Sequence, residues 1–401
     1  MIVNPLNPNP RAPEVHVVHG ADAYANTMAS LKGIDLSALK GAKVLLKPNV
    51  GRMSKAGTGV NTNPQVVAAA VDAFRKAGAT VAIGESPITG VNTLEAFELS
   101  GMSAMAKEKS CPLIDMDERK PVITPVPNGR VIDSLKICAD VFDFDYIVSI
   151  PVMKIHMHTG VTLGVKNMKG CLWRRSKVDL HMLPHLDDTA DKSLDIAIGD
   201  MATVLRPHFT IIDGSIGLEG LGPGAGTPKE LNVVVAGADA FAADAVACRL
   251  MGRTANEVSH LRNGAANGCG VIDLDRIKVY PENWQNYASD FQAAPKNLSF
   301  EFPDVEVLDK NSCSACQSTL LLFLQRFGES LADYIPNGEP LKVAIGKGHE
   351  TLPEGTLCIG QCTARHKEGG IFVPGCPPVG SQIFKTLQCH EQNGNSSEAM
   401  Q

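Results

Sequence analysis

Short apolar segments alternate with stretches of helical periodicity over the first 240 residues of the chain. Compact apolar runs bounded by Gly, Pro or polar residues predict strands, and apolar residues recurring every three or four positions predict helices. Pro64 opens one such helix, at a position where the missing backbone N–H costs nothing. The expected strands cover residues 14–20, 43–50, 80–87, 144–153, 209–217 and 231–239.

The order strand, loop, helix, strand over residues 43–87 is a βαβ unit, which predicts parallel strands with functional loops at their carboxyl ends. The expected fold class is therefore α/β, with a mainly parallel sheet and helices on both faces. A chain of 401 residues exceeds what one hydrophobic core usually fills. We expect an α/β domain over 1–300, a smaller α/β unit over 304–390 and a tail over 391–401.

Composition narrows the range of partners. The formal net charge of −6 gives no overall attraction to nucleic acid or to an anionic membrane. The N-terminus lacks the features of a secretory signal, and no apolar run is long enough for a membrane helix. We therefore expect a cytoplasmic protein with no nucleic-acid or membrane partner, and we leave a homo-oligomer open.

The cysteines predict a metal centre near the C-terminus. Of 11 cysteines, six fall between residues 313 and 389. Cys313 and Cys316 lie between an expected strand and helix, while Cys362 and Cys376 follow expected strands. In a parallel sheet these four thiols share one edge, where they could hold an iron-sulfur cluster. Zn is the alternative cofactor, and a redox disulfide or no metal is a third reading.

The segments CSAC, GQCTARHKEGG and VPGCPP resemble the cluster site of the nickel-iron hydrogenase small subunit and the related subunit of respiratory complex I. The resemblance implies a flavodoxin-like sheet that holds one [4Fe-4S] cluster through Cys313, Cys316, Cys362 and Cys376. The spacing before the paired glycines is longer than in those proteins, and Cys358 is an additional thiol. Cys358 is therefore a substitute candidate for the third ligand.

Residues 146–178 contain no Asp or Glu but several Lys, Arg and His residues, which predicts an anion-binding cleft. A Lys in such a cleft can hold charge or, if burial lowers its pKa, act as a base. The expected catalytic residues are Lys47, Glu85, Lys154 and Lys166, and the expected anion-binding residues are Asn49, His156, Thr159, Asn167, Lys169, His181 and Glu219.

Each of these interpretations has a structural alternative. The basic segment could be a solvated face that covers an acidic neighbour, with Arg174, Arg175 and Lys177 merely exposed. Lys47 and Glu85 could form a buried salt bridge. His181 and His185 could bind a metal, although Pro184 interrupts their helix. Asp239 and Asp244 could cap the following helix.

A second resemblance covers residues 40–255. It rests on KPNVG, NTNP, GES, PVMKIHMHTGVTLGVKNMKG, IIDGSIGLEGLGPGAGTP and ADAFAADAVACRLMG, in this order. These motifs resemble domain-of-unknown-function family 362, whose members often carry an additional iron-sulfur portion. The resemblance therefore supports the fold and the domain division more than it identifies a reaction.

Together these features favour an oxidoreductase that couples a [4Fe-4S] cluster to a small anionic substrate or cofactor. One alternative is a non-redox transferase or isomerase acting on a phosphorylated or carboxylated compound, with a structural metal. Another is a subunit that delivers electrons or a cluster to a redox protein partner.

Overall fold

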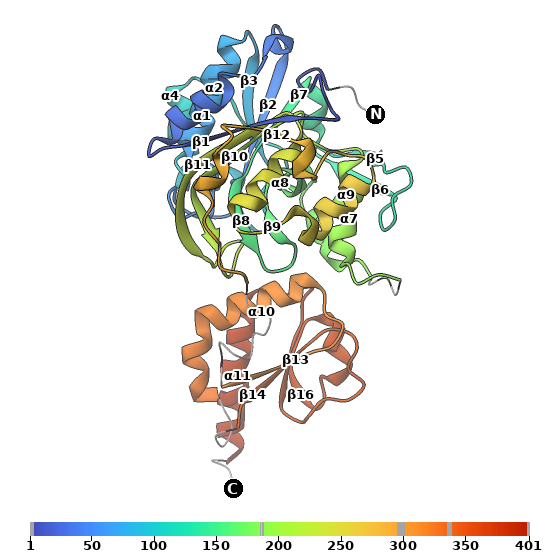
Figure 1. Ribbon diagram of the computed structural model, residues 1–401. Coiled ribbons are helices and arrows are strands. Elements are labelled where there is room, and N and C mark those ends of the chain that lie inside the picture. The colour runs from blue at the N-terminus through green and yellow to red at the C-terminus, as the bar shows by residue number, and fades with distance from the viewer. Residues whose placement is uncertain are drawn as a thin grey trace. The chain divides into compact units, whose positions relative to one another are not determined.

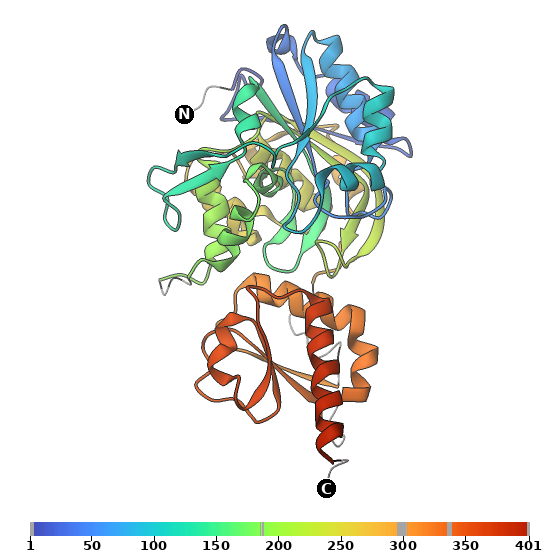
Figure 2. The ribbon, with the colours of Figure 1, turned by 180° about the vertical axis from the view of Figure 1, so that it is seen from behind.

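The computed structural model describes residues 4–184, 186, 188–294, 302, 304–334 and 339–398. The chain divides into two compact units, Met1–Ala294 (unit 1) and Pro295–Gln401 (unit 2). Figures 1 and 2 show both units from opposite sides.

Unit 1 is built on a large mixed sheet, in which the described strands follow the order β12-β1-β11-β10-β7-β2-β3-β4. The run from β10 to β4 is parallel, whereas β11 lies antiparallel to both of its neighbours. The expected α/β fold with a mainly parallel sheet is confirmed. The strands on this path are β1 Glu14–His19, β2 Lys43–Pro48, β3 Thr80–Glu85, β4 Leu113–Asp115, β7 Tyr146–Ile150, β10 Phe209–Glu219, β11 Thr227–Gly237 and β12 Lys278–Tyr280.

The expected strand over 144–153 is two strands in the structure. Pro151 separates β7 from β8, Val152–His156, because proline has no N–H to continue a ladder. Strand β8 leaves the path of the sheet and pairs with β10 and with β9, Gly160–Thr162. All five residues of β8 are buried, so Lys154 and His156 lie inside the unit.

Helices cover both faces of the sheet (Figure 1). One apolar core includes residues of α1, α2 and α4, and a second includes residues of α7, α8 and α9. Helix α2 begins as expected, with Asn63 accepting a hydrogen bond from the Gln65 amide and Pro64 in the first turn. The helices are α1 Ala23–Leu31, α2 Pro64–Lys76, α3 Thr93–Leu99, α4 Met102–Glu108, α5 Gly164–Asn167, α6 Ser176–Asp179, α7 Ser193–Ala202, α8 Ala240–Leu250 and α9 Ser259–Ala266. Strands β5 Val122–Pro125 and β6 Ser134–Ile137 form a separate antiparallel hairpin.

Unit 2 contains a smaller parallel sheet with the strand order β13-β14-β15-β16. The last residues of these strands are register partners, so their carboxyl ends share one edge. Helices α10 and α11 contact each other, and Phe323 of α10 and Ile383 of α11 lie in the apolar core. The elements are β13 Val305–Asp309, α10 Ser314–Phe327, β14 Leu341–Ile345, β15 Thr356–Ile359, β16 Gly370–Val373 and α11 Gly380–Glu398.

In the part of the chain that the structure describes, no helix is both long enough and apolar enough to cross a membrane.

Candidate functional site

A buried ion pair lies at the carboxyl ends of the neighbouring strands β2 and β3. Lys47 Nζ lies 2.8 Å from Glu85 Oε2, and both side chains are almost fully buried. Glu85 also accepts hydrogen bonds from the Val50 and Ser86 amides. The salt bridge that the sequence left as an alternative is therefore present. Its multiple hydrogen bonds satisfy the charges that burial would otherwise leave unpaired.

Two asparagines connect this ion pair to Lys154. Asn167 Nδ2 donates to Lys47 O, and Asn49 Nδ2 donates to Asn167 Oδ1 at 3.0 Å. Lys154 Nζ then donates to Asn49 Oδ1 at 2.7 Å and to Val60 O at 2.6 Å. Both acceptors are neutral. Burial first, followed by the charges of Arg52 and Lys166, lowers the pKa of Lys154 well below its usual range.

Two further buried lysines come from α5 and the 3-10 turn Met168–Cys171 that follows it. Lys166 Nζ donates to Thr162 Oγ1 at 3.3 Å, and burial lowers the pKa of Lys166 to about 7, with Asp195 opposing this shift. Lys169 Nζ lies 2.7 Å from His181 Nε2. Burial lowers the pKa of Lys169 and the pKa of His181 well below their usual ranges.

His156 lies two residues beyond Lys154 on β8, and its Nδ1 accepts a hydrogen bond from the His158 amide at 3.1 Å. The two imidazole rings are 5.7 Å apart. Burial and then the charge of Lys166 lower the pKa of His156 well below its usual range. Thr159 is buried in the same turn and donates to Val161 O.

These groups form one buried cationic site, which we call the basic cluster. Burial of several like charges is costly unless opposite charge accompanies them. Of the nearby carboxylates, Glu85 is paired with Lys47, and Asp195 lies 3.4 Å from His260. The arrangement therefore suits an anion. The members of the basic cluster are Arg52, Lys154, His156, Lys166, Lys169 and His181.

Glycines allow the surrounding backbone to pass close to the Lys47–Glu85 ion pair, to strand β8 and to Arg52 of the basic cluster. A Cβ on Gly170 would lie 2.5 Å from Lys47 Nζ. In the Gly-rich loop after β10, a Cβ on Gly222 would lie 1.8 Å from Ile155 O, and one on Gly224 would lie 2.8 Å from Arg52 Nε. The loop therefore packs directly against strand β8 and against Arg52, which a side chain at either glycine would prevent.

Some expected site residues lie in other contacts. Glu219 Oε2 is 3.2 Å from Lys229 Nζ and accepts a hydrogen bond from the Gln292 amide, at the end of β10. The expectation that Lys177 is merely exposed is wrong, because Lys177 is buried and donates to Ser86 Oγ. Arg174 and Arg175 are exposed as expected. His185 lies outside the described residues, so the proposed His181–His185 metal pair stays a prediction.

The sequence interpretation missed Arg52 and the positioning role of Asp244. The Asp244 carboxylate accepts hydrogen bonds from the Gly164 and Val165 amides at 2.7 and 2.9 Å, so it caps α5 from within α8. Burial raises the pKa of Asp244 to about 8. Asp239, in contrast, caps α8, the helix that follows it, as the alternative interpretation had it. A distant cap leaves no local sequence signal, whereas Arg52 lies in a Gly-rich loop that the sequence did mark.

In unit 2, four cysteines lie beyond the carboxyl edge of the sheet, and we call them the cysteine rim. Cys313 is the N-cap residue of α10, and its hydrogen bond from the Cys316 thiol lowers the pKa of Cys313 to about 6. The bond to Cys313, burial, and then the charges of Cys362 and Cys376 raise the pKa of Cys316. The four thiols are thus within electrostatic reach of one another. Cys358 lies within β15, fully buried, and burial alone raises the pKa of Cys358.

The donor set of the cysteine rim fits an iron-sulfur cluster, because such clusters are held by four thiolates. Among the described residues, no group of three or more His, Cys, Asp or Glu side chains is arranged to hold a metal ion. A multi-iron cluster separates its protein ligands more widely than one tetrahedral zinc ion does. The cysteine rim therefore has the type of donors that a cluster needs, but its described side chains are not arranged as a metal site in this structure.

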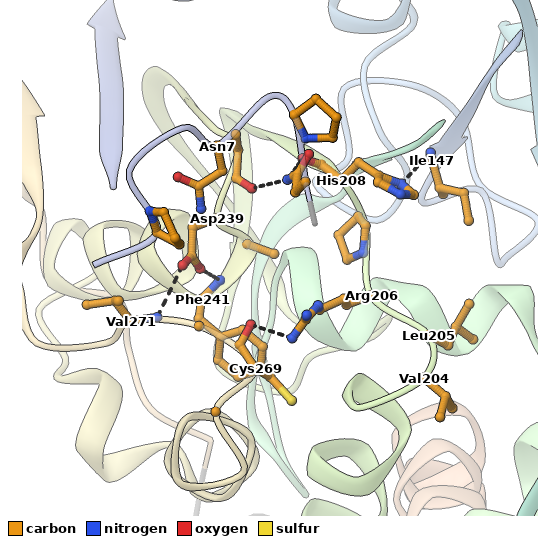
Figure 3. A pocket seen from close by; sticks show the side chains of 18 of the residues that line it. Asn7, Ile147, Val204, Leu205, Arg206, His208, Asp239, Phe241, Cys269 and Val271 are labelled. Atoms are coloured by element: carbon orange, nitrogen blue, oxygen red, sulfur yellow. Dashed lines mark hydrogen bonds between the residues drawn. The ribbon is translucent and has the colours of Figure 1, made fainter. Parts of the chain in front are cut away.

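A separate cavity of about 810 Å³ lies at the opposite edge of the unit 1 sheet, at the amino ends of β7 and β10 (Figure 3). Its polar side chains bond mainly to the backbone. Arg206 donates to Cys269 O, Asp239 accepts from the Val271 amide, and His208 accepts from the Ile147 amide. These bonds hold the fold together, so we place the candidate functional site at the basic cluster.

The fold and the basic cluster define an α/β protein with a buried cationic site at the carboxyl ends of parallel strands. The chain belongs to the family described as domain of unknown function 362, which matches residues 44–249. A thylakoid-associated protein from Synechocystis is 29% identical over 206 residues, which cover 51% of this chain and 62% of that protein. The chain thus matches less than two thirds of this relative's length.

Two solved structures show a distant likeness. The lactate racemase apoprotein from Thermoanaerobacterium thermosaccharolyticum aligns with a TM-score of 0.37 and 12% identity, over 58% of this chain and 56% of that one. A structural-genomics protein from Thermotoga maritima aligns with a TM-score of 0.32 and 12% identity, over 62% and 60% of the two chains.

Proposed function

We propose that the basic cluster binds a small anionic substrate or cofactor, and that the cysteine rim holds a [4Fe-4S] cluster that exchanges electrons in the reaction. The observation that carries the proposal is the burial of Lys154, Lys166 and Lys169 together. The hydrogen-bond acceptors of Lys154 and Lys166 are neutral oxygens, so an anion would supply the missing opposite charge. On this proposal the protein is an oxidoreductase of the cytoplasm with a redox protein as its electron partner.

The side chains of the basic cluster would have two roles, binding of the anion and proton transfer. Lys154 and Lys169 would hold negative charge on the substrate. Lys166 can take up or release a proton near neutral pH, because burial lowers the pKa of Lys166 to about 7. Asn49 accepts a hydrogen bond from the Lys154 amine, and Asn167 accepts one from the Lys47 amine. The Lys47–Glu85 pair fixes the ends of β2 and β3.

Cys313, Cys316, Cys362 and Cys376 would hold the cluster. When bound, a [4Fe-4S] cluster supplies one-electron transfer. Gly360 allows the backbone to pass close to Cys316, since a Cβ there would lie 3.3 Å from Cys316 Sγ.

Calorimetric titration with inorganic phosphate and with succinate tests the anion site. We expect binding by the full chain and a loss of about tenfold or more in affinity for Lys166→Met, since hydrogen bonds to charged groups contribute about 1.5–3 kcal/mol. Lys278→Met is the matched control, because Lys278 is an exposed residue 3.7 Å from Glu14 on the sheet edge. Absence of binding of both anions would refute the anion site.

Anaerobic purification with iron and sulfide analysis, followed by EPR of the reduced protein, tests the cluster. We expect iron and sulfide in equal amounts and a signal that Cys362→Ser abolishes. Cys389→Ser should keep both, because Cys389 is an exposed thiol on α11, away from the strand ends. An iron-free protein would remove the redox half of the proposal.

Lys166 favours a second candidate, a non-redox isomerase or transferase acting on a carboxylated or phosphorylated compound. A lysine whose pKa is lowered to about 7 suits proton abstraction next to an anionic group. Turnover that survives Cys362→Ser and Cys376→Ser in a folded protein would favour this candidate over the redox enzyme.

A further inference from the structure

We infer that the cavity at the amino ends of β7 and β10 is a second ligand site, which binds a small, mainly apolar molecule carrying one carboxylate group. The cavity volume of about 810 Å³ is within the range of small-molecule sites in proteins, about 300–1,000 Å³. This cavity lies at the sheet edge opposite the basic cluster, so the inference does not depend on the proposed anion site.

The wall of the cavity is mainly apolar and includes three phenylalanines, Phe142, Phe144 and Phe241. Phe142 is 52% exposed, whereas Phe241 is 1% exposed and Leu205 is 4% exposed. Exposed and fully buried apolar side chains thus line the same hollow. An apolar ligand is favoured there, because it removes apolar surface of the wall from water.

The charged side chains of the lining leave one positive charge over. They are Arg206, Arg276 and Asp239. The Asp239 carboxylate already accepts hydrogen bonds from three backbone amides. In the part of the chain that the structure describes, no carboxylate lies within salt-bridge distance of Arg206. A ligand with one negative charge therefore complements the cavity.

Arg206 is the group that would bind the carboxylate. Its Nη1 donates to Cys269 O at 3.0 Å, and Figure 3 shows this bond in the wall of the cavity. Over the described residues, the Arg206 side chain has no other hydrogen bond to an oxygen atom. A guanidinium carries further N–H donors in a fixed fork, and these match the two oxygens of a carboxylate.

His208 adds no second charge to the cavity. Its Nδ1 accepts a hydrogen bond from the Ile147 amide at 3.1 Å, which places the proton of the neutral ring on Nε2. Burial and then the charge of Arg206 lower the pKa of His208, so the ring is neutral near pH 7. A ligand with one carboxylate thus matches the lining better than a dianion does.

Calorimetric titration of the full chain with 3-phenylpropionate, hexanoate and 3-phenylpropionamide tests the inference without any substitution. We expect an acid to bind about tenfold or more tightly than the amide, because only a carboxylate forms charge-assisted hydrogen bonds with Arg206. Tighter binding of 3-phenylpropionate than of hexanoate identifies an aromatic ligand, and the reverse order identifies an aliphatic one. Equal affinity for 3-phenylpropionate and its amide, or no binding of either acid, would overturn the inference.

Substitutions then place the carboxylate. Arg206→Gln should remove the preference for 3-phenylpropionate over its amide, and Arg206→Lys should restore part of it. This preference compares two ligands on one protein, so a change of stability alone does not alter it. Arg249→Gln is the matched control, because Arg249 is an exposed residue of α8 outside the lining.

Lys166→Met separates this cavity from the basic cluster, and it should leave the affinity for 3-phenylpropionate unchanged. If Lys166→Met weakens binding and Arg206→Gln does not, the acid binds at the basic cluster and the inference fails.

Discussion

At the residue scale, Lys166 is the group on which the proposed chemistry depends. Its amine is buried, and its bonded partner is the neutral Thr162 hydroxyl. The neutral amine is therefore stable at a pH where an exposed lysine is charged. The charged or titratable groups that share its surroundings are Arg52, Lys154, His156, Lys169, His181, Asp195 and His260.

The affinity for succinate should fall as the pH rises from about 6.5 to about 8.5. With its pKa lowered to about 7, Lys166 loses its proton over this range, and a bound anion favours the protonated amine. Binding should therefore take up protons. Calorimetry in two buffers of different ionisation enthalpy measures this uptake. Lys166→Met should flatten the pH dependence, and a flat dependence in the unsubstituted protein would contradict the role of Lys166.

Gly170→Ala should destabilise unit 1 by about 1–3 kcal/mol, because overpacking a dense interior forces side chains and backbone to shift. The added Cβ would lie 2.4 Å from Lys47 Cε and 2.6 Å from Glu85 Oε1. Urea unfolding measures the free-energy difference. Gly51→Ala is the control, because no atom lies within 4 Å of a Cβ placed there. Equal free energies of unfolding for the two variants would show that the Lys47–Glu85 ion pair accommodates the added Cβ.

At the element scale, one hydrogen-bonded contact positions the short helix that carries Lys166 and Asn167. Helix α5 has four residues and cannot be stable alone. Asp244 of α8 accepts hydrogen bonds from its first two amides, so a long helix of the core holds the short helix of the site in place.

Asp244→Ala should lower the free energy of unfolding by about 1–2 kcal/mol and also weaken succinate binding, because α5 loses its cap. Asp22 is the N-cap residue of α1, and its carboxylate accepts a hydrogen bond from the Ala25 amide. Asp22→Ala should therefore lower the free energy of unfolding but leave succinate binding unchanged. Denaturant unfolding and calorimetry separate the two effects. If Asp244→Ala binds succinate as tightly as Asp22→Ala does, α5 does not depend on its cap for its position.

Some of the helices and strands could be predicted from the sequence, and others could not. Periodicity and turn residues located β2, β3 and α2 close to their observed bounds. Parallel order then placed Lys47 and Glu85 at one sheet edge. Periodicity did not separate β7 from β8 at Pro151, since the residues on both sides of the proline, Ile150, Val152 and Met153, are apolar. Nor did it reveal the Asp244 cap or the burial of Lys177, because these depend on partners distant in the sequence.

At the scale of the whole molecule, the two units have separate hydrophobic cores. Unit 1 contains two apolar clusters around its sheet, and the third cluster lies within unit 2. A net charge of −6 gives no general attraction for anions, so anion binding must come from the local arrangement of cations.

Loss of the proposed cluster from unit 2 should therefore leave succinate binding by unit 1 unchanged, because domains with their own cores keep their structure independently. Calorimetry on Cys362→Ser, compared with the iron-loaded protein, measures this independence. Cys389→Ser serves as the control for substitution of a thiol. A loss of succinate affinity confined to the iron-free variant would show that the two sites are coupled.

The central claim is that the buried cations of unit 1 form an anion site, and anomalous diffraction from crystals soaked in selenate tests it most directly. The account predicts a selenium peak within hydrogen-bonding distance of the amines of the basic cluster, at Lys166 and either Lys154 or Lys169. A map with selenate only at surface positions, and none among these buried lysines, would contradict the account.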